Sequence, residues 1–341
     1  MRFSKRIGSI LGGIALTALV AGCDRAQPGG QQSSVETADM ATDSYAPVAP
    51  GEKYKSNEIS PVHMVADAPV STFAVDVDTG AYANVRRFLN QGQLPPADAV
   101  RTEEMINYFR YDYPLPADRA APFSVTTDVA QSPWNPDTKL LRIGLRGYDL
   151  SYAKRPPANL IFLVDVSGSM DEPDKLPLVK AALSLLADQI GPEDRVGIVV
   201  YAGAAGVVLD PTGDPAEIKD ALDQLKAGGS TAGGEGLQLA YNLARDHFIK
   251  GGVNRILLAT DGDFNVGITD QKQLEQLIEQ ERDDGITLTT LGFGQGNFND
   301  AVMESMADLG NGNYAYIDSA MEAKKVLSRS SPPPSSPSRR T

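Results

Sequence analysis

The sequence is poor in the residue types that zinc-binding and many catalytic proteins rely on, and in positive charge. Its 341 residues include one cysteine and two histidines, and 31 Lys and Arg stand against 44 Asp and Glu. A single cysteine has no partner for an internal disulfide. His63 lies in a polar segment and His247 ends an expected helix, which argues against a zinc site or a Ser-His-Asp triad. The formal net charge of −13 argues against nucleic-acid binding.

The first 22 residues have the pattern of a secretory signal. Three basic residues precede an apolar run over 7–20. Residues 19–23, at the end of this run and just after it, read LVAGC. This ending resembles a bacterial lipobox, so we predict that Cys23 carries lipid and becomes the mature N-terminus. Removing residues 1–22 takes away three positive charges and no negative charge, which moves the formal net charge from −13 to −16. We expect a lipid-anchored protein of the cell envelope that faces the periplasm. Asp24 resembles an inner-membrane retention signal, but the choice of membrane stays open.

Composition divides the rest of the chain into four segments. Residues 23–69 are rich in Gln, Ser, Pro, Gly and Ala without a sustained apolar period, which predicts a flexible tether. Residues 70–157 and 158–327 have the hydrophobic patterns of two folded domains. Residues 328–341 are almost wholly Ser, Pro and Arg and follow an interrupted helical pattern. We therefore expect a low-complexity tail at which the chain is truncated or frame-shifted.

The 70–157 segment mixes strand-like alternation with helical periodicity, which predicts a small α+β domain. The expected strands are 71–80, 123–131 and 139–147, and the expected helices are 81–92 and 101–111. Asp76 and Asp78 form an acidic turn that lacks the later ligands of a calcium loop. We therefore expect both aspartates to have structural roles.

The 158–327 segment alternates apolar strands with amphipathic helices. The expected strands are 160–165, 195–201, 206–210, 255–260, 287–294 and 313–317. The expected helices are 174–190, 214–225, 233–248, 270–283 and 299–310. Near-continuous apolar strands with helices between them predict an α/β fold, in which a doubly wound, mostly parallel sheet is covered on both faces. In a 3-2-1-4-5 strand order, the first and fourth strands would be neighbours at the point where the order reverses.

Oxygen-bearing side chains follow these two neighbouring strands. Asp165, Ser167 and Ser169 come after the first strand, Asp261 comes after the fourth, and Thr231 lies in the glycine-rich loop before a helix. Ligands of such sheets bind at the carboxyl ends of the strands. Carboxylates and hydroxyls are the hard oxygen donors that Mg²⁺ prefers. Asp165 and Asp261 would repel each other without a cation between them, so the sequence predicts a metal site.

These motifs resemble the metal-ion-dependent adhesion site of von Willebrand factor type A domains, over about residues 159–327. The resemblance implies that the metal ligands are Asp165, Ser167, Ser169, Thr231 and Asp261. It also implies that the ion is Mg²⁺, with Mn²⁺ or Ca²⁺ as alternatives. Ser230 competes with Thr231, but the spacing from Thr231 to Gly236 fits the family better. Asp263 is expected at the rim of the site. The lipobox, the 70–157 segment and this domain together resemble the YfbK-type lipoproteins of bacteria.

The function that this resemblance implies is a binding module, in which the metal keeps one position open for an Asp or Glu of a partner protein. The alternative is an enzyme: a metal-assisted hydrolase, or a subunit of a chelatase-like ATPase assembly. No general base other than the ligands is evident near the site. The loop that contains Thr231 also lacks a phosphate-binding lysine, because Gly234 and Glu235 stand where it would be. We therefore expect neither an enzyme nor a nucleotide-binding protein.

Overall fold

The structure is a computed structural model that describes residues 51–56, 61–72, 77–117, 121–148, 155–231, 233–262 and 271–329. The predicted signal, Cys23, most of the tether, Asp76, Asp263 and the tail from residue 330 lie outside these ranges. None of the helices in the described ranges has both the length and the apolar character needed to cross a bilayer.

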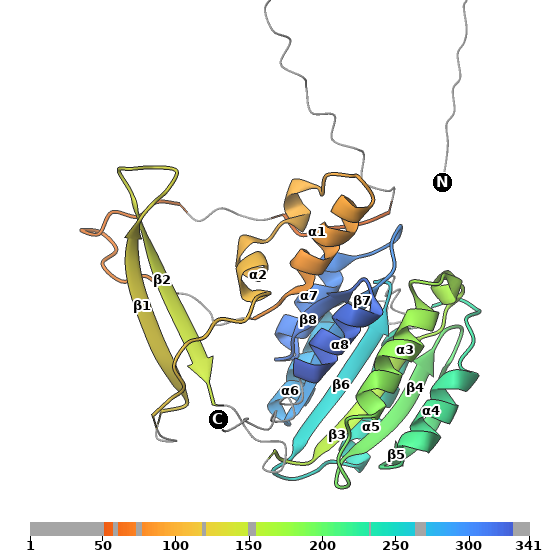
Figure 1. Cartoon of the computed structure of the whole chain (residues 1–341). Coiled ribbons are helices and arrows are strands. Elements are labelled where there is room, and N and C mark those ends of the chain that lie inside the picture. The colour runs from red at the N-terminus through yellow and green to blue at the C-terminus, as the bar shows by residue number, and fades with distance from the viewer. Residues whose placement is uncertain are drawn as a thin grey trace, which may run out of the picture. The chain divides into compact units, whose positions relative to one another are not determined.

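A six-stranded sheet forms the centre of the described chain (Figure 1). Its strands are β3 Ala158–Asp165, β4 Arg195–Tyr201, β5 Ala205–Thr212, β6 Val253–Thr260, β7 Ile286–Phe293 and β8 Tyr314–Ile317. Their order is β5-β4-β3-β6-β7-β8, and every neighbouring pair is parallel except β4 and β5. The predicted doubly wound, mostly parallel sheet is therefore confirmed, with β3 and β6 side by side at its centre.

Helices cover both faces of this sheet, and the side chains of β3 divide between two cores. The helices are α3 Leu176–Ala187, α4 Pro215–Gln224, α5 Gly233–Asp246, α6 Gln271–Asp283, α7 Asp300–Leu309 and α8 Ala320–Arg329. Phe162 and Val164 share a core with α3, α4 and α8, whereas Ile161 and Leu163 share one with α5, α6 and α7. Alternate residues of a strand point to opposite faces, which is why a strand buried on both faces is apolar throughout.

Helix α1, Gly80–Asn90, packs against β8 at one edge of the sheet. Ala83 joins a small core with Tyr314 and Tyr316, and a Cβ at Gly80 would lie only 2.3 Å from the Tyr314 ring. The Asp78 carboxylate accepts a hydrogen bond from the Tyr314 backbone N–H at 2.7 Å, so the expected structural role of Asp78 is confirmed. The strand expected over 71–80 is wrong at its described end. Residues 77–79 are irregular and Gly80 already begins the helix.

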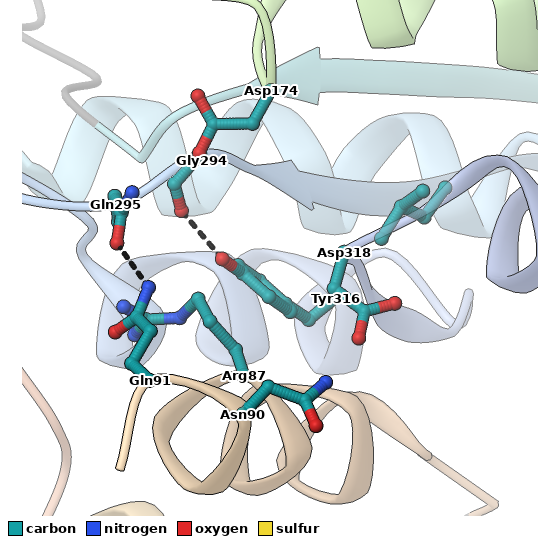
Figure 2. Close-up of a pocket in the computed structure, with 9 residues that line it drawn as sticks. Arg87, Asn90, Gln91, Asp174, Gly294, Gln295, Tyr316 and Asp318 are labelled. Carbon is teal, nitrogen blue, oxygen red and sulfur yellow. Dashed lines mark hydrogen bonds between the residues drawn. The ribbon is translucent and has the colours of Figure 1, made fainter. Parts of the chain in front are cut away.

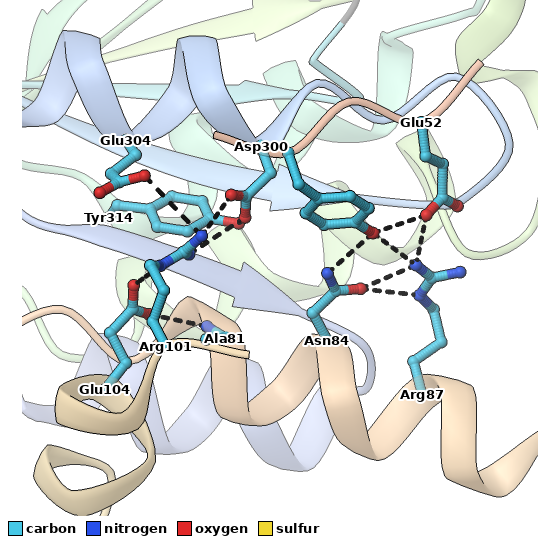
Figure 3. A network of polar contacts seen from close by, with 10 residues as sticks. Glu52, Ala81, Asn84, Arg87, Arg101, Glu104, Asp300, Glu304 and Tyr314 are labelled. Atoms are coloured by element: carbon cyan, nitrogen blue, oxygen red, sulfur yellow. Dashed lines mark hydrogen bonds and ion pairs between the residues drawn. The ribbon is translucent and has the colours of Figure 1, made fainter. Parts of the chain in front are cut away.

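Buried charged side chains tie the N-terminal segments to α7 and β8 (Figure 3). Arg101 precedes helix α2, Thr102–Asn107, and forms ion pairs with Glu104 and with Asp300 at the start of α7. The Tyr314 hydroxyl donates to the same Asp300 at 2.6 Å. Arg87 on α1 pairs with Glu52 at 2.9 Å. Each of these buried carboxylates thus has a cationic partner, which is the condition under which buried ion pairs persist.

Two further strands, β1 Phe123–Gln131 and β2 Lys139–Gly147, form an antiparallel hairpin with the predicted bounds. Paired residues share a face, and three of the pairs are Val125 with Leu145, Thr127 with Ile143, and Val129 with Leu141. This face is therefore largely apolar, and most of its side chains are exposed. The opposite face carries polar pairs, and Tyr113 packs closely over its Gly144.

Candidate metal centre

The candidate site begins at the C-terminal end of β3. Asp165 is the last residue of this strand, is fully buried, and lies between β4 and β6. The chain then turns through a short 3-10 helix, Gly168–Asp171, which the buried Met170 anchors in the core. The turn brings the Ser167 backbone N–H to 2.9 Å from Asp165 Oδ1, and the Ser167 and Ser169 hydroxyls to 3.1 Å from each other.

Neighbouring strands hold the second oxygen of Asp165. Thr260 Oγ1 at the end of β6 donates to Asp165 Oδ2 at 2.8 Å, and the Tyr201 hydroxyl at the end of β4 donates to it at 3.2 Å. Burial raises the pKa of Asp165 to about 6, although hydrogen bonds from Ser167 and Thr260 oppose the rise. The negative charge of Asp261 is a smaller cause of the same rise.

The glycine-rich loop before α5 is fastened to the turn after β3. The Gly228 N–H donates to the Val166 carbonyl at 2.8 Å, and the Gly168 N–H donates to the Gly229 carbonyl at 3.0 Å. Gly229 has a φ of +90°, a conformation that side chains disfavour, so glycine allows the loop to come this close. Thr231 follows at the same edge of the sheet and is half-buried, whereas Ser230 is exposed.

Asp261 follows β6, and its carboxylate contacts the ammonium group of Lys175. Its carboxylate is fully buried and accepts hydrogen bonds from Lys175 Nζ at 2.9 Å and from Asn297 Nδ2 at 3.1 Å. The repulsion expected between Asp165 and Asp261 is therefore offset in part by a cation of the chain itself, the Lys175 ammonium. Asp263, expected at the rim, lies outside the described residues.

The donors present fit a hard divalent cation. Two carboxylates meet hydroxyl groups at the carboxyl edge of the sheet, and all are oxygen donors of the kind that Mg²⁺ binds. Among the residues that the structure describes, no three His, Cys, Asp or Glu side chains group in a way that could hold a metal ion. A cation here would therefore depend on serine and threonine hydroxyls and on water in addition to the two aspartates.

Comparison with known families agrees with this fold. Residues 160–263 match the family described as von Willebrand factor type A domain, and residues 49–142 match one described as von Willebrand factor. The Escherichia coli protein YfbK is 49% identical over 283 residues, which are 81% of this chain and 49% of that protein. The chain is a von Willebrand factor type A domain protein.

Other relatives of this von Willebrand factor type A protein are more distant. A UPF0353 protein of Mycolicibacterium gilvum is 28% identical and matches 51% of this chain and 59% of its own length. The chain spans about half the length of the curated relatives it matches. Among solved structures, BatB of Bacteroides thetaiotaomicron is 24% identical with a TM-score of 0.43, and covers 50% of this chain and 96% of its own. A mussel byssus protein, proximal thread matrix protein 1 with zinc in its MIDAS motif, is 23% identical with a TM-score of 0.41. The match covers 51% of this chain and 45% of the mussel protein's chain.

Two polar residues of this von Willebrand factor type A domain, Lys175 and Asn297, were not predicted at the site. Asn297 lies in the loop after β7, whose carboxyl end is at the same edge of the sheet as those of β3 and β6, and this topology was the available signal. Lys175 stands at the start of an expected helix, where a positive charge is unfavourable. The unfavourable position of this lysine was a second sign in the sequence that it has a partner elsewhere.

A cavity of about 210 Å³ adjoins this site (Figure 2). Its lining includes Arg87, Asp174, Gly294, Gln295, Tyr316 and Asp318. The Tyr316 hydroxyl donates to the Gly294 carbonyl at 2.6 Å, which closes one side. None of the five candidate ligands lines this cavity, so the candidate metal centre lies beside it and not inside it.

Proposed function

We propose that this chain binds a partner protein through a divalent cation, Mg²⁺ by preference. The ion would be held by Asp165, Ser167, Ser169, Thr231 and Asp261, and an Asp or Glu of the partner would complete its coordination. The observation that carries the proposal is the meeting of two buried carboxylates at the ends of β3 and β6, where the strand order reverses.

The residues around Asp165 would prepare it for a cation. A carboxylate has about four lone-pair positions, and the contacts described above use three of them, from Ser167, Thr260 and Tyr201. These three donors fix the carboxylate in one orientation and leave it capacity to bind a metal. When bound, the metal would supply positive charge that attracts the partner's carboxylate. Ser169 and Thr231 would add neutral oxygens, so these ligands add no further negative charge to repel that carboxylate.

We propose a binding module in preference to an enzyme. Thr260 donates a hydrogen bond to Asp165, and Asn297 donates one to Asp261, so the two residues orient the carboxylates. General acid–base catalysis needs a further group that can reach a substrate proton. The candidate ligands do not supply one while they hold a cation.

The deciding experiment is a Mg²⁺ titration by calorimetry of wild type, Asp165→Ala and Asp171→Ala. Asp171 is an exposed acid of the same turn and serves as the control. We expect Asp165→Ala to lose Mg²⁺ binding and Asp171→Ala to keep it. Capture of periplasmic proteins on the wild type should then depend on Mg²⁺ and be lost in EDTA. If Asp165→Ala binds Mg²⁺ as tightly as wild type, the site assignment fails.

We also propose that lipid on Cys23 anchors the chain to a membrane with the folded part in the periplasm. The support is the sequence of the first 23 residues, which lie outside the described ranges. Wild type should enter the detergent phase in a phase-partitioning experiment, and Cys23→Ser should stay in the aqueous phase. Equal partitioning of both forms into the aqueous phase contradicts the anchor.

A further inference from the structure

Lys175 occupies a helix position that disfavours a positive charge. It is the residue immediately before α3, where side chains that accept hydrogen bonds are preferred, and it makes no capping hydrogen bond. The helix macrodipole places partial positive charge at this end, so a lysine there is destabilising by itself. A residue that contradicts its local environment in this way points to an interaction elsewhere.

That interaction is with Asp261 and Asn297, two residues far along the chain. Lys175 Nζ lies 2.9 Å from Asp261 Oδ2 and 3.0 Å from Asn297 Oδ1. The lysine side chain is only 6% exposed and the aspartate is fully buried. Asn297 also donates to Asp261 Oδ2 at 3.1 Å, so the three groups form a closed arrangement around one carboxylate oxygen.

Packing around the lysine stem maintains this position. Gly294 follows β7 with a φ of +72°, and a Cβ there would lie 2.4 Å from the Lys175 Cγ and 2.5 Å from its Cε. Any side chain at this position would therefore collide with the lysine. The glycine leaves the space in which the extended stem carries the ammonium from the start of α3 to Asp261.

We infer that Lys175 is the resident cation of the site, which neutralises Asp261 in the metal-free protein and weakens the binding of Mg²⁺. This inference rests on the proposed metal site. A divalent ion at Asp261 would either displace the ammonium or lie close to it, and both alternatives oppose binding. Tight binding would then require the added negative charge of the partner's carboxylate, so the metal and the partner would each increase the affinity for the other.

Mg²⁺ titration of the full chain tests this inference. We expect Lys175→Met to lower the Mg²⁺ dissociation constant about tenfold or more, because a positive charge beside the ion is removed. Lys180→Met is the matched control, since Lys180 lies on α3 and donates hydrogen bonds to the carbonyls of Asp223 and Leu225, and its dissociation constant should equal that of wild type. If wild type binds Mg²⁺ and Lys175→Met binds it no more tightly, the inference fails and the proposed metal site stands.

Melting in EDTA provides a readout that needs no metal. Lys175→Met and Asp261→Asn should each lower the melting temperature, because each leaves one buried group without its partner. The double variant should lose less than the sum of the two single losses. Additive losses contradict the role of Lys175 as counter-ion. A different outcome is possible, in which the losses are coupled but neither wild type nor Lys175→Met binds Mg²⁺. The proposed metal site then fails, and so does the claim that Lys175 weakens Mg²⁺ binding. The role of Lys175 as counter-ion of Asp261 is upheld.

Discussion

Strand β3 and the β1–β2 hairpin both carry a continuous row of apolar side chains but differ in what covers them. Seven of the eight residues of β3 are buried, between helices on both faces. In the hairpin, Val125 is 57% exposed and Leu141 is 62% exposed, although both lie on its apolar face. Apolar alternation thus selects which face a strand offers, but only a second layer turns that face into a core.

The comparison separates the formation of a strand from its stabilisation. Backbone pairing in the hairpin is continuous from Phe123 with Gly147 to Gln131 with Lys139. A two-stranded hairpin is nevertheless marginally stable in water, because pairing alone buries little apolar area. The central sheet is also paired along its strands and has, in addition, two cores. Substitutions should therefore have large effects in the sheet and small effects in the hairpin.

The same substitution at two phenylalanines should show the largest contrast. Phe162 on β3 is fully buried, so Phe162→Ala should lower the free energy of unfolding by about 3–5 kcal/mol. Phe123 on β1 is 48% exposed, and Phe123→Ala should lower it by less than about 1 kcal/mol. Urea unfolding of both variants measures the difference. Equal losses would show that the hairpin has a core of its own.

Two arginines extend the contrast to ion pairs. Arg101 is buried with Glu104 and Asp300, and Arg101→Ala removes the cation that pairs with both buried carboxylates, which should cost about 3–5 kcal/mol. Arg142 on β2 pairs with Asp128 in the open, and solvent screens that pair. Arg142→Ala should unfold at the same urea concentration as wild type. A clear shift in its midpoint would contradict the view that the polar face of the hairpin is solvated.

The smallest effect is a dependence on pH. In the metal-free protein, the pKa of Asp165 rises to about 6 through burial, so the folded form holds this proton more tightly than the unfolded chain. The resulting stability, about 3 kcal/mol, is complete below about pH 4 and is lost as the pH rises through about 6. Unfolding in EDTA should show this loss in wild type relative to Asp165→Asn.

If the difference in stability between wild type and Asp165→Asn is constant between pH 4 and 7, the carboxyl of Asp165 does not titrate as its burial implies.

Local patterns predicted most of the elements, for reasons that these two regions make clear. The strand 123–131 was predicted at its true bounds, and so was its partner 139–147. The 3-2-1-4-5 order considered for the sheet matches its first five strands. Alternation and periodicity report on neighbours along the chain, so they suffice for such elements. The helix expected over 101–111 ends at Asn107, and Tyr108, the next residue, stacks on Tyr82 with ring centroids 3.8 Å apart.

The candidate site was predicted less completely than the sheet. The oxygen donors follow strands whose adjacency the topology implies, so Asp165 and Asp261 could be placed together in advance. Lys175 reaches Asp261 across 86 positions of sequence, and its direction depends on the space at Gly294. The covering of β8 by α1 likewise arises from contacts between distant segments, which no local period encodes.

The contact between Asp78 and Tyr314 has a consequence for solubility. An edge strand with free N–H and C=O groups is a template on which another chain can add a strand. At β8 the Tyr314 N–H is taken by the Asp78 carboxylate, and the Thr79 N–H approaches the Tyr314 carbonyl at 3.5 Å. The opposite edge strand, β5, pairs irregularly and contains Pro211, which has no N–H to offer. Both edges of the sheet thus offer fewer free backbone groups on which another copy of this protein could add a strand.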